Sequence, residues 1–123
     1  METDGKVIAF VATTDGKRAR KFYEGVLGLR VVGEDDFALT LDANGTMVRV
    51  TKVSNIVVAP YTVLGWQVTD IASSVGALRD RGVKFEKYEF FTQDALGVWT
   101  APSGARVAWF KDPDGNVLSL TQL

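Results

Sequence analysis

The chain has 123 residues, of which 46% are hydrophobic and 24% charged, and this composition is typical of a globular domain with one core. A net charge of −1 and a pI near 5.4 give the chain no electrostatic reason to bind nucleic acid or an anionic membrane surface. The absence of Cys and His from the sequence excludes disulfides, thiol nucleophiles and Ser-His-Asp triads.

The first half of the sequence predicts one helix among four strands. Length and β-branched residues favour a buried strand over residues 6–12. Apolar residues at helical spacing predict a helix within residues 17–29 that stops at Gly28. The N-cap of this helix is expected at Thr14 or Asp15. Three short strands follow, over residues 29–32, 37–41 and 47–53.

The second half repeats this order of elements. A strand over residues 62–68 is followed by a helix over residues 70–80, which ends at Gly82. Asp114-Gly115, between two apolar runs, predicts a hairpin near the end of the chain. The remaining strands are expected over residues 83–88, 105–111 and 116–121, with a long loop over about 89–104 after the first of them.

Matched positions in the two halves, such as Asp15 and Asp70, indicate an internal duplication. Each half is a βαβββ unit, at about residues 5–54 and 61–122, within a single domain of residues 1–123. We therefore predict an α+β fold in which two βαβββ modules in tandem curl their sheets around a shared cleft, with the helices outside.

Motifs in both halves point to a known superfamily. Phe22-Tyr23 and Leu27-Gly28-Leu29 follow Asp15 in the first half, and "VTDI" and "AWFKDPDGNVLSL" stand at the corresponding places in the second. With these motifs, and with an order of elements that matches over essentially the whole chain, the sequence resembles the vicinal oxygen chelate superfamily. This superfamily includes glyoxalase I, the extradiol dioxygenases and the bleomycin-resistance proteins.

The resemblance implies where a metal ion would bind. Enzymes of the superfamily hold a divalent metal through one ligand on each of four strands, usually His, Glu or Gln. The corresponding positions in this sequence are Ile8, Arg49, Val63 and Ser119. Two of them are aliphatic, Arg49 would repel a cation, and a serine hydroxyl is a poor ligand at neutral pH. We therefore expect no metal site and no cofactor.

If these four positions face the cleft, strand alternation places a mixed set of side chains there. The cleft-facing set is Ile8, Phe10, Met47, Arg49, Thr51, Val63, Gly65, Gln67, Val117, Ser119 and Thr121. Their neighbours along each strand are almost all apolar, as a face covered by a helix requires. A mostly apolar cleft with a few polar groups is the usual composition of a small-molecule site.

From this face, and from the aromatic loop that follows residue 88, we select ten candidate ligand-binding residues. They are Phe10, Met47, Arg49, Gln67, Phe90, Phe91, Trp99, Trp109, Ser119 and Thr121. Arg49 could bind a carboxylate or phosphate, or equally it could pair with an acid or extend to solvent. Phe90, Phe91 and Trp99 could stack on a flat ligand, and the phenylalanines could instead form a dimer contact.

Other residues have a simpler structural interpretation. Trp66 is best explained as a core residue, and the sequence leaves Trp109 undecided between core and ligand. Glu86, Glu89 and Asp94 could supply a general base, but a solvated strand edge explains them better. The sequence therefore assigns no catalytic residue.

These observations favour a metal-independent small-molecule-binding protein that holds a planar or partly apolar ligand in an apolar, aromatic-rimmed cleft. The alternative is a glyoxalase-like lyase or isomerase that acts on a small substrate, anionic if Arg49 contacts it. An interaction domain without a ligand has no sequence feature in its favour. Small members of the superfamily pair, so the resemblance implies a homodimer.

The sequence also bears on where the protein is found. No apolar run is long enough to cross a bilayer, and residues 1–6 lack the basic and apolar regions of a signal peptide. We expect a cytoplasmic protein without a membrane partner.

Overall fold

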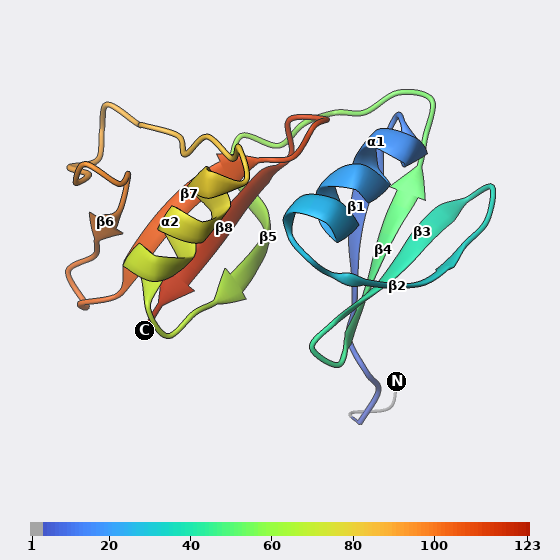
Figure 1. The fold of residues 1–123 in the computed structure, drawn as a ribbon, viewed down its shortest axis with the longest axis horizontal. Helices are drawn as coiled ribbons and strands as arrows, with labels where there is room; N and C mark the ends of the chain where they lie inside the picture. Colours follow the sequence, from blue (N-terminus) through green and yellow to red (C-terminus); the bar gives the residue numbers. More distant parts are fainter. Residues whose placement is uncertain (1–3) are drawn as a thin grey trace. The chain divides into compact units, whose positions relative to one another are not determined.

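The computed structural model describes residues 4–123. The chain divides after Val57 into two compact units, called here the first and the second module. Each module contains one four-stranded sheet with a helix packed on one of its faces (Figure 1). The predicted α+β fold of two βαβββ modules in tandem is confirmed. None of the helices formed by residues 4–123 is long and apolar enough to cross a membrane.

The first module has the sheet order β1-β4-β3-β2, with β1 and β4 parallel and the other pairs antiparallel. Its strands are β1 (Ile8–Thr13), β2 (Arg30–Glu34), β3 (Ala38–Ala43) and β4 (Thr46–Lys52). The helix begins as α1 (Gly16–Arg20) and continues as a π-helix, η1 (Lys21–Val26). The bounds differ by one to three residues from those predicted, as expected for strand and helix ends.

The helix of the first module is capped by local hydrogen bonds. Of the two predicted N-caps, Asp15 fills the position, because its carboxylate accepts from the Arg18 backbone N–H at 3.1 Å. At the other end the Leu27 N–H donates to the Phe22 carbonyl, five residues back, at 2.9 Å, which is the π-helical spacing. Gly28 follows with φ of 75°, a left-handed conformation that glycine adopts without strain, and the helix ends there.

The second module has the equivalent order β5-β8-β7-β6, with β5 and β8 parallel. Its strands are β5 (Thr62–Gln67), β6 (Trp99–Thr100), β7 (Arg106–Lys111) and β8 (Val117–Gln122), and its helix is α2 (Ile71–Asp80). The turn between β7 and β8 confirms the predicted hairpin. Asp112 fixes this turn, since its carboxylate accepts from the backbone N–H groups of Asp114 and Asn116.

One predicted strand is wrong. Residues 83–88 do not form a strand, and only Phe85 makes an isolated bridge, to Phe110 on β7. The edge strand of this sheet is instead β6, two residues long, which lies inside the predicted loop and pairs with β7 through Trp99 and Val107. The edge position is therefore shared between two short segments that are separated in sequence.

Each sheet has one face covered by its own helix and one face without a helix, called here the helix-free face. In the first module Val11, Val48 and Val50 point toward the helix and are buried. Their neighbours Phe10 and Met47 point the other way and are exposed. This contrast confirms the predicted alternation, and β1–β4 pairing places Phe10 opposite Arg49.

The helix-free face of the second module contains one close contact between neighbouring strands. Gly65 on β5 lies opposite Ser119 on β8. A methyl carbon on Gly65 would lie 2.7 Å from Ser119 Oγ and 3.3 Å from Ser119 O. The backbone oxygen cannot move without disturbing the sheet, so this position accepts only glycine without a local shift.

We predict that Gly65→Ala lowers the free energy of unfolding by about 1–3 kcal/mol through overpacking, and that adding Ser119→Ala restores part of this loss. Urea unfolding followed by circular dichroism measures both effects. Gly76→Ala is the matched control, because no atom lies within 4 Å of its new methyl carbon. On α2 it should stabilise by up to about 1 kcal/mol. A Gly65→Ala variant as stable as the wild type would contradict the Gly65–Ser119 register.

A single carboxylate ties the edge strand β2 to the helix and to β4. Glu34 accepts from Arg20 Nη1 at 3.1 Å and from Lys52 Nζ at 2.8 Å. The hydrogen bond from Lys52, followed by that from Arg20, lowers the pKa of Glu34. A lowered pKa in the folded state means that this stabilisation is present above the unfolded pKa and is lost as the pH falls through the folded pKa.

We predict that Glu34→Gln lowers the free energy of unfolding by about 1 kcal/mol or less at pH 7, because the ion pairs are partly exposed. The difference from wild type should shrink as the pH falls below about 4.3, the usual value for glutamate. Urea unfolding at a series of pH values measures this difference in the free energy of unfolding. Asp36→Asn, at an exposed acid close in sequence, should show no such trend. A Glu34→Gln effect that is independent of pH would contradict the ion-pair account.

Candidate functional site

The edge of the second sheet is interrupted by a loop. Glu86 N–H donates to the Trp109 carbonyl at 2.8 Å, which places the chain beside β7. The chain then leaves the sheet and returns at Trp99, opposite Val107. Residues 87–98, called here the edge loop, form this excursion, and they carry three of the candidate site's aromatic side chains.

One side-chain amide joins the two ends of the edge loop. Gln93 Nε2 donates to the Glu86 carbonyl at 2.9 Å and to the Gly97 carbonyl at 2.8 Å. Gln93 Oε1 accepts from the Tyr88 N–H at 2.7 Å. The side chain thereby satisfies three backbone groups that lie outside any regular ladder. It fixes the point where the chain leaves the sheet relative to the point where it returns.

Asp94 shapes the tip of the edge loop. Its Oδ1 accepts from the Leu96 and Val98 backbone N–H groups, each at 2.9 Å. Its other oxygen lies 3.7 Å from Arg106. Glu86 is likewise paired, with Lys111 Nζ at 3.3 Å. These contacts support the structural interpretation of both acids.

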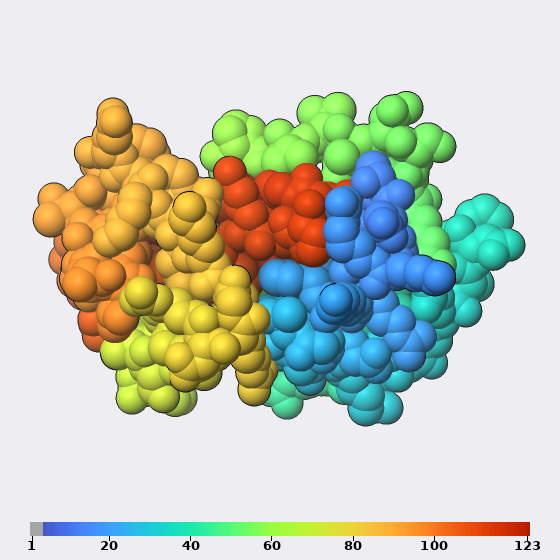
Figure 2. All heavy atoms as spheres, turned by 45° about the horizontal axis from the view of Figure 1, so that its top comes forward, coloured from blue at the N-terminus to red at the C-terminus, as the bar shows by residue number. Residues whose placement is uncertain are grey.

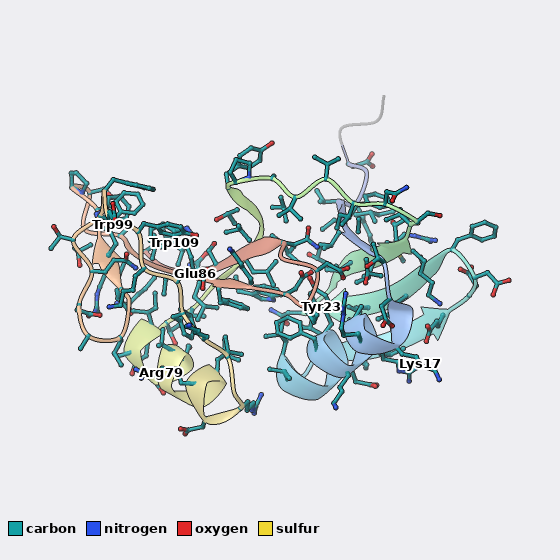
Figure 3. The ribbon with its side chains drawn as sticks, turned by 90° about the horizontal axis from the view of Figure 1, so that it is seen from above. Lys17, Tyr23, Arg79, Glu86, Trp99 and Trp109 are labelled. Carbon is teal, nitrogen blue, oxygen red and sulfur yellow. The ribbon has the colours of Figure 1, made fainter. Side chains whose placement is uncertain are left out.

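Phe91 covers the two tryptophans of this face. Its ring is parallel to that of Trp109, with centroids 5.0 Å apart and planes at 2°. The centroid of Trp99 lies 4.4 Å from Phe91 and 6.1 Å from Trp109. Figure 3 shows Trp99 and Trp109 on the side of the sheet opposite α2. Trp109, which the sequence left undecided, therefore lies in a stack of rings on the helix-free face.

Two further rings complete this group. Tyr88 lies edge-on to Trp109 with centroids 5.4 Å apart, and it stacks on Phe90 at 5.5 Å. Phe90 also lies 4.6 Å from Phe91 and is 76% exposed. Burial, and then the charge of Glu86, raises the pKa of Tyr88. The five rings, called here the aromatic cluster, are Tyr88, Phe90, Phe91, Trp99 and Trp109.

Trp66 is not part of this cluster. Its ring stacks on that of Phe110 at 6.4 Å, and Phe110 is fully buried and also contacts Phe85. These three rings lie on the face of the sheet that α2 covers. Trp66 is half-buried, and its stacking on Phe110 supports its interpretation as a residue that packs on the core.

The remaining second-module candidates lie on the sheet beside the cluster. Trp109 is directly opposite Ser119 on the neighbouring strand, and Ser119 is opposite Gly65. Gln67 lies opposite Thr121 in the next row of the sheet. Strand pairing thus brings seven of the ten candidates onto one face and the loop next to it.

The other three candidates lie together on the helix-free face of the first module. Phe10 is 61% exposed and sits opposite Arg49, and Met47 is two residues away on the same strand. Within the described residues, no carboxylate lies within 4 Å of Arg49. The pKa of Asp35 is lowered first by backbone hydrogen bonds from Phe37 and Ala38 and then by the charge of Arg49. Arg49 is therefore not engaged in the acid pairing that the sequence left open.

A hollow lies next to the aromatic cluster. It has a volume of about 610 Å³ and borders Trp99. Its lining is Thr92, Gln93, Asp94, Val98, Trp99, Thr100, Ala101 and Pro102. The lining combines one aromatic face with hydroxyl, amide and carboxylate groups, which is a usual mixture for a small-molecule site.

Sequence reasoning missed Tyr88 and Gln93. Tyr88 was assigned to a strand that does not form, so its approach to Trp109 was not foreseen. The aromatic density of residues 88–91 was the only available signal for it. Gln93 gave no signal, since nothing in its neighbourhood distinguishes a structural amide from a surface one.

We predict that Gln93→Glu destabilises the protein in a pH-dependent way. The new carboxylate would face the two carbonyls that Nε2 now binds at 2.8 and 2.9 Å, so its pKa should be raised. A glutamate whose pKa is raised in the folded state stabilises that state fully below its unfolded pKa, about 4.3. This stabilisation is lost as the pH rises through the pKa of the folded state. The variant should be less stable than wild type by about 2 kcal/mol at pH 7 and by less at pH 4.

Chemical unfolding at the two pH values measures this difference. Gln67→Glu is the control, because Gln67 is exposed and lies on β5, away from the edge loop. It should change stability by no more than about 0.5 kcal/mol. Equal effects of the two substitutions would show that Gln93 does not hold the loop.

Comparisons with known proteins agree with this architecture. The superfamily member from Sphaerobacter thermophilus has a TM-score of 0.75 at 24% identity and covers 97% of each chain. A second member, from Alicyclobacillus acidocaldarius, has a TM-score of 0.71 at 17% identity and covers 97% of this chain and 91% of that one. A lactoylglutathione lyase from Agrobacterium tumefaciens has a TM-score of 0.74 at 14% identity and covers 99% of this chain and 96% of the other. At these identities the likeness is one of fold.

No curated protein matches the chain. A family model, however, covers nearly all of it, matching residues 7–120. The chain therefore belongs to the Glyoxalase/Bleomycin resistance protein/Dioxygenase superfamily.

Proposed function

We propose that this chain binds a small, flat and largely apolar molecule against the aromatic cluster of the second module, without a metal ion. The observation that carries the proposal is the cluster itself. Five rings contact one another on a face without a helix, the outermost, Phe90, is 76% exposed, and a hollow of about 610 Å³ borders Trp99. If these rings belonged to the hydrophobic core of the module, they would lie on the other face of the sheet, beneath α2.

The cluster is well prepared for stacking. Phe91 and Trp109 are already parallel, and the edge loop is fixed by Gln93, so little conformational freedom remains to be lost on binding. Each aromatic pair contributes about 0.5–1.5 kcal/mol beyond the area that it buries. The hollow lies within the range of about 300–1,000 Å³ that small-molecule sites occupy.

The residues at the superfamily's metal positions do not suit a divalent cation. Ile8 and Val63 have no donor atom, and Arg49 carries a positive charge. Ser119 offers one neutral hydroxyl. Within residues 4–123, no three His, Cys, Asp or Glu side chains are grouped where they could hold a metal ion. The donor chemistry of this chain thus supports binding without a metal.

Arg49 in the first module offers a separate position where an acidic group could bind. Its guanidinium has no carboxylate partner in the described part of the chain, and Phe10 and Met47 beside it are exposed. A guanidinium binds carboxylate or phosphate through two parallel hydrogen bonds. Phe10, Met47 and Arg49 are therefore proposed as an anion-binding position of the first module, taken by itself.

The alternative function, a lyase or isomerase, has less support. Such an enzyme needs a side chain that moves a proton. Of the three acids considered as a general base, Glu86 pairs with Lys111 and Asp94 binds the loop backbone, whereas Glu89 is exposed. We also expect a homodimer in the cytoplasm, and Phe90 is then a residue that either a ligand or a second copy could cover.

Tryptophan fluorescence tests the proposal. Trp66→Phe leaves Trp99 and Trp109 as the reporters, both in the cluster. Naphthoate and the neutral naphthamide should both quench this fluorescence saturably. Phe90→Ala should weaken binding of both by about 3–10-fold, from the loss of one stacking partner.

Phe37→Ala is the matched control, since Phe37 is an equally exposed phenylalanine in the first module. It should leave both affinities unchanged. Absence of saturable quenching, or equal losses in Phe37→Ala and Phe90→Ala, would refute the proposal. If Phe90→Ala instead turns a dimer into a monomer in sedimentation without changing quenching, Phe90 is a contact between copies.

A further inference from the structure

A second hollow lies on the other side of the edge loop. The end of α2 and the tip of the loop enclose a volume of about 320 Å³. Its lining is Arg79, Gly82, Val83, Lys84, Phe85, Lys87, Ala95 and Leu96. No residue of this set lines the hollow beside Trp99. Figure 2 shows the orange atoms of the edge loop lying beside the yellow atoms at the end of α2.

The charge of this lining is entirely positive. Arg79, Lys84 and Lys87 contribute three cations, and no lining residue is acidic. Within residues 4–123, none of the three lies within 4 Å of a carboxylate. Lys87 Nζ donates only to the neutral Asp94 carbonyl, at 2.6 Å. Three like charges around one concavity repel one another and concentrate a positive potential inside it.

Several cations elsewhere in the described part of the chain are paired with acids. Five of them form ion pairs with acids within 4 Å, namely Arg20, Arg30, Lys52, Arg106 and Lys111. At these five positions an acidic side chain therefore neutralises the positive charge. The hollow at the end of α2, in contrast, gathers three cations and has no acid in its lining.

The floor of the hollow is apolar and held in place. Phe85 is partly buried, and its ring lies 5.4 Å from that of the core residue Phe110. Val83 N–H donates to the Leu78 carbonyl at 3.0 Å, which anchors the chain to the end of α2. Asp94 fixes the opposite wall through Leu96 N–H. The walls are thus hydrogen-bonded turns.

We infer that this hollow binds a small organic anion, a carboxylate or a phosphate monoester, whose apolar body rests on Val83 and Phe85. Arg79 supplies a planar fork that matches either headgroup with two hydrogen bonds, and Lys84 adds a mobile ammonium. Lys87 contributes charge from a fixed position. This site is on the α2 side of the module and does not depend on whether the aromatic cluster binds a ligand.

Amide and indole NMR signals of the whole ¹⁵N-labelled chain distinguish the two sites. On titration with phenyl phosphate or benzoate, the amide signals of Gly82, Lys84 and Leu96 should shift and the indole N–H signals of Trp99 and Trp109 should stay. The neutral benzamide should cause no such shifts. Because screening weakens charge recognition, added NaCl should reduce the affinity. Inorganic phosphate alone shows how much of the binding the headgroup provides.

The Arg79→Gln, Lys84→Gln double variant should weaken binding of phenyl phosphate by about tenfold or more. Lys17→Gln, at an exposed cation on α1 (Figure 3), is the matched control and should leave binding unchanged. Both variants alter exposed side chains, so folding is retained. Equal shifts with benzamide, unchanged affinity in the double variant, or movement of the indole signals alone would overturn the inference.

Discussion

The second module depends on one side-chain amide. Gln93 binds three backbone groups that would otherwise lack partners, and in doing so it ties the start of the edge loop to its end. The position of Phe91 over Trp109 follows from this closure, as does that of Tyr88 at the edge of the same ring. Both hollows of the module have a wall in the loop that Gln93 holds. A substitution of Gln93 would therefore alter the position of the edge loop and the shape of both hollows, one on each face of the sheet.

The sheets supply the fixed frame on which these features rest. Parallel pairing of β5 with β8 places Gly65, Ser119 and Trp109 in one row across three strands. The missing side chain at Gly65 leaves room for the Ser119 hydroxyl. Close packing against Gly65 thus gives a structural reason for a small residue at position 119.

Much of this architecture could be predicted from the sequence, because its signals are local. Alternation along β1 and β4 separated Phe10 and Arg49 from Val11 and Val50, and Asp114-Gly115 marked a hairpin. The edge loop could not be predicted. Phe85 and its neighbours alternate like a strand, but the side chains of Gln93 and Asp94 hydrogen-bond the backbone where the chain leaves the sheet. Hydrogen bonds from side chains to the backbone leave no periodic pattern in the sequence. The sequence therefore predicted an aromatic-rich loop but not the stacking of its rings.

The interrupted edge has a consequence for self-association. An unbroken edge strand exposes a row of N–H and C=O groups that a second chain can extend, and this is a common route to aggregation. In the second module the outermost strand, β6, is only two residues long. On the side of β6 away from β7, the chain makes one isolated bridge, between Gln93 and Trp99. A partner therefore finds no continuous backbone template at this edge. Any contact made there must be built from side chains, and so it can be specific for one partner.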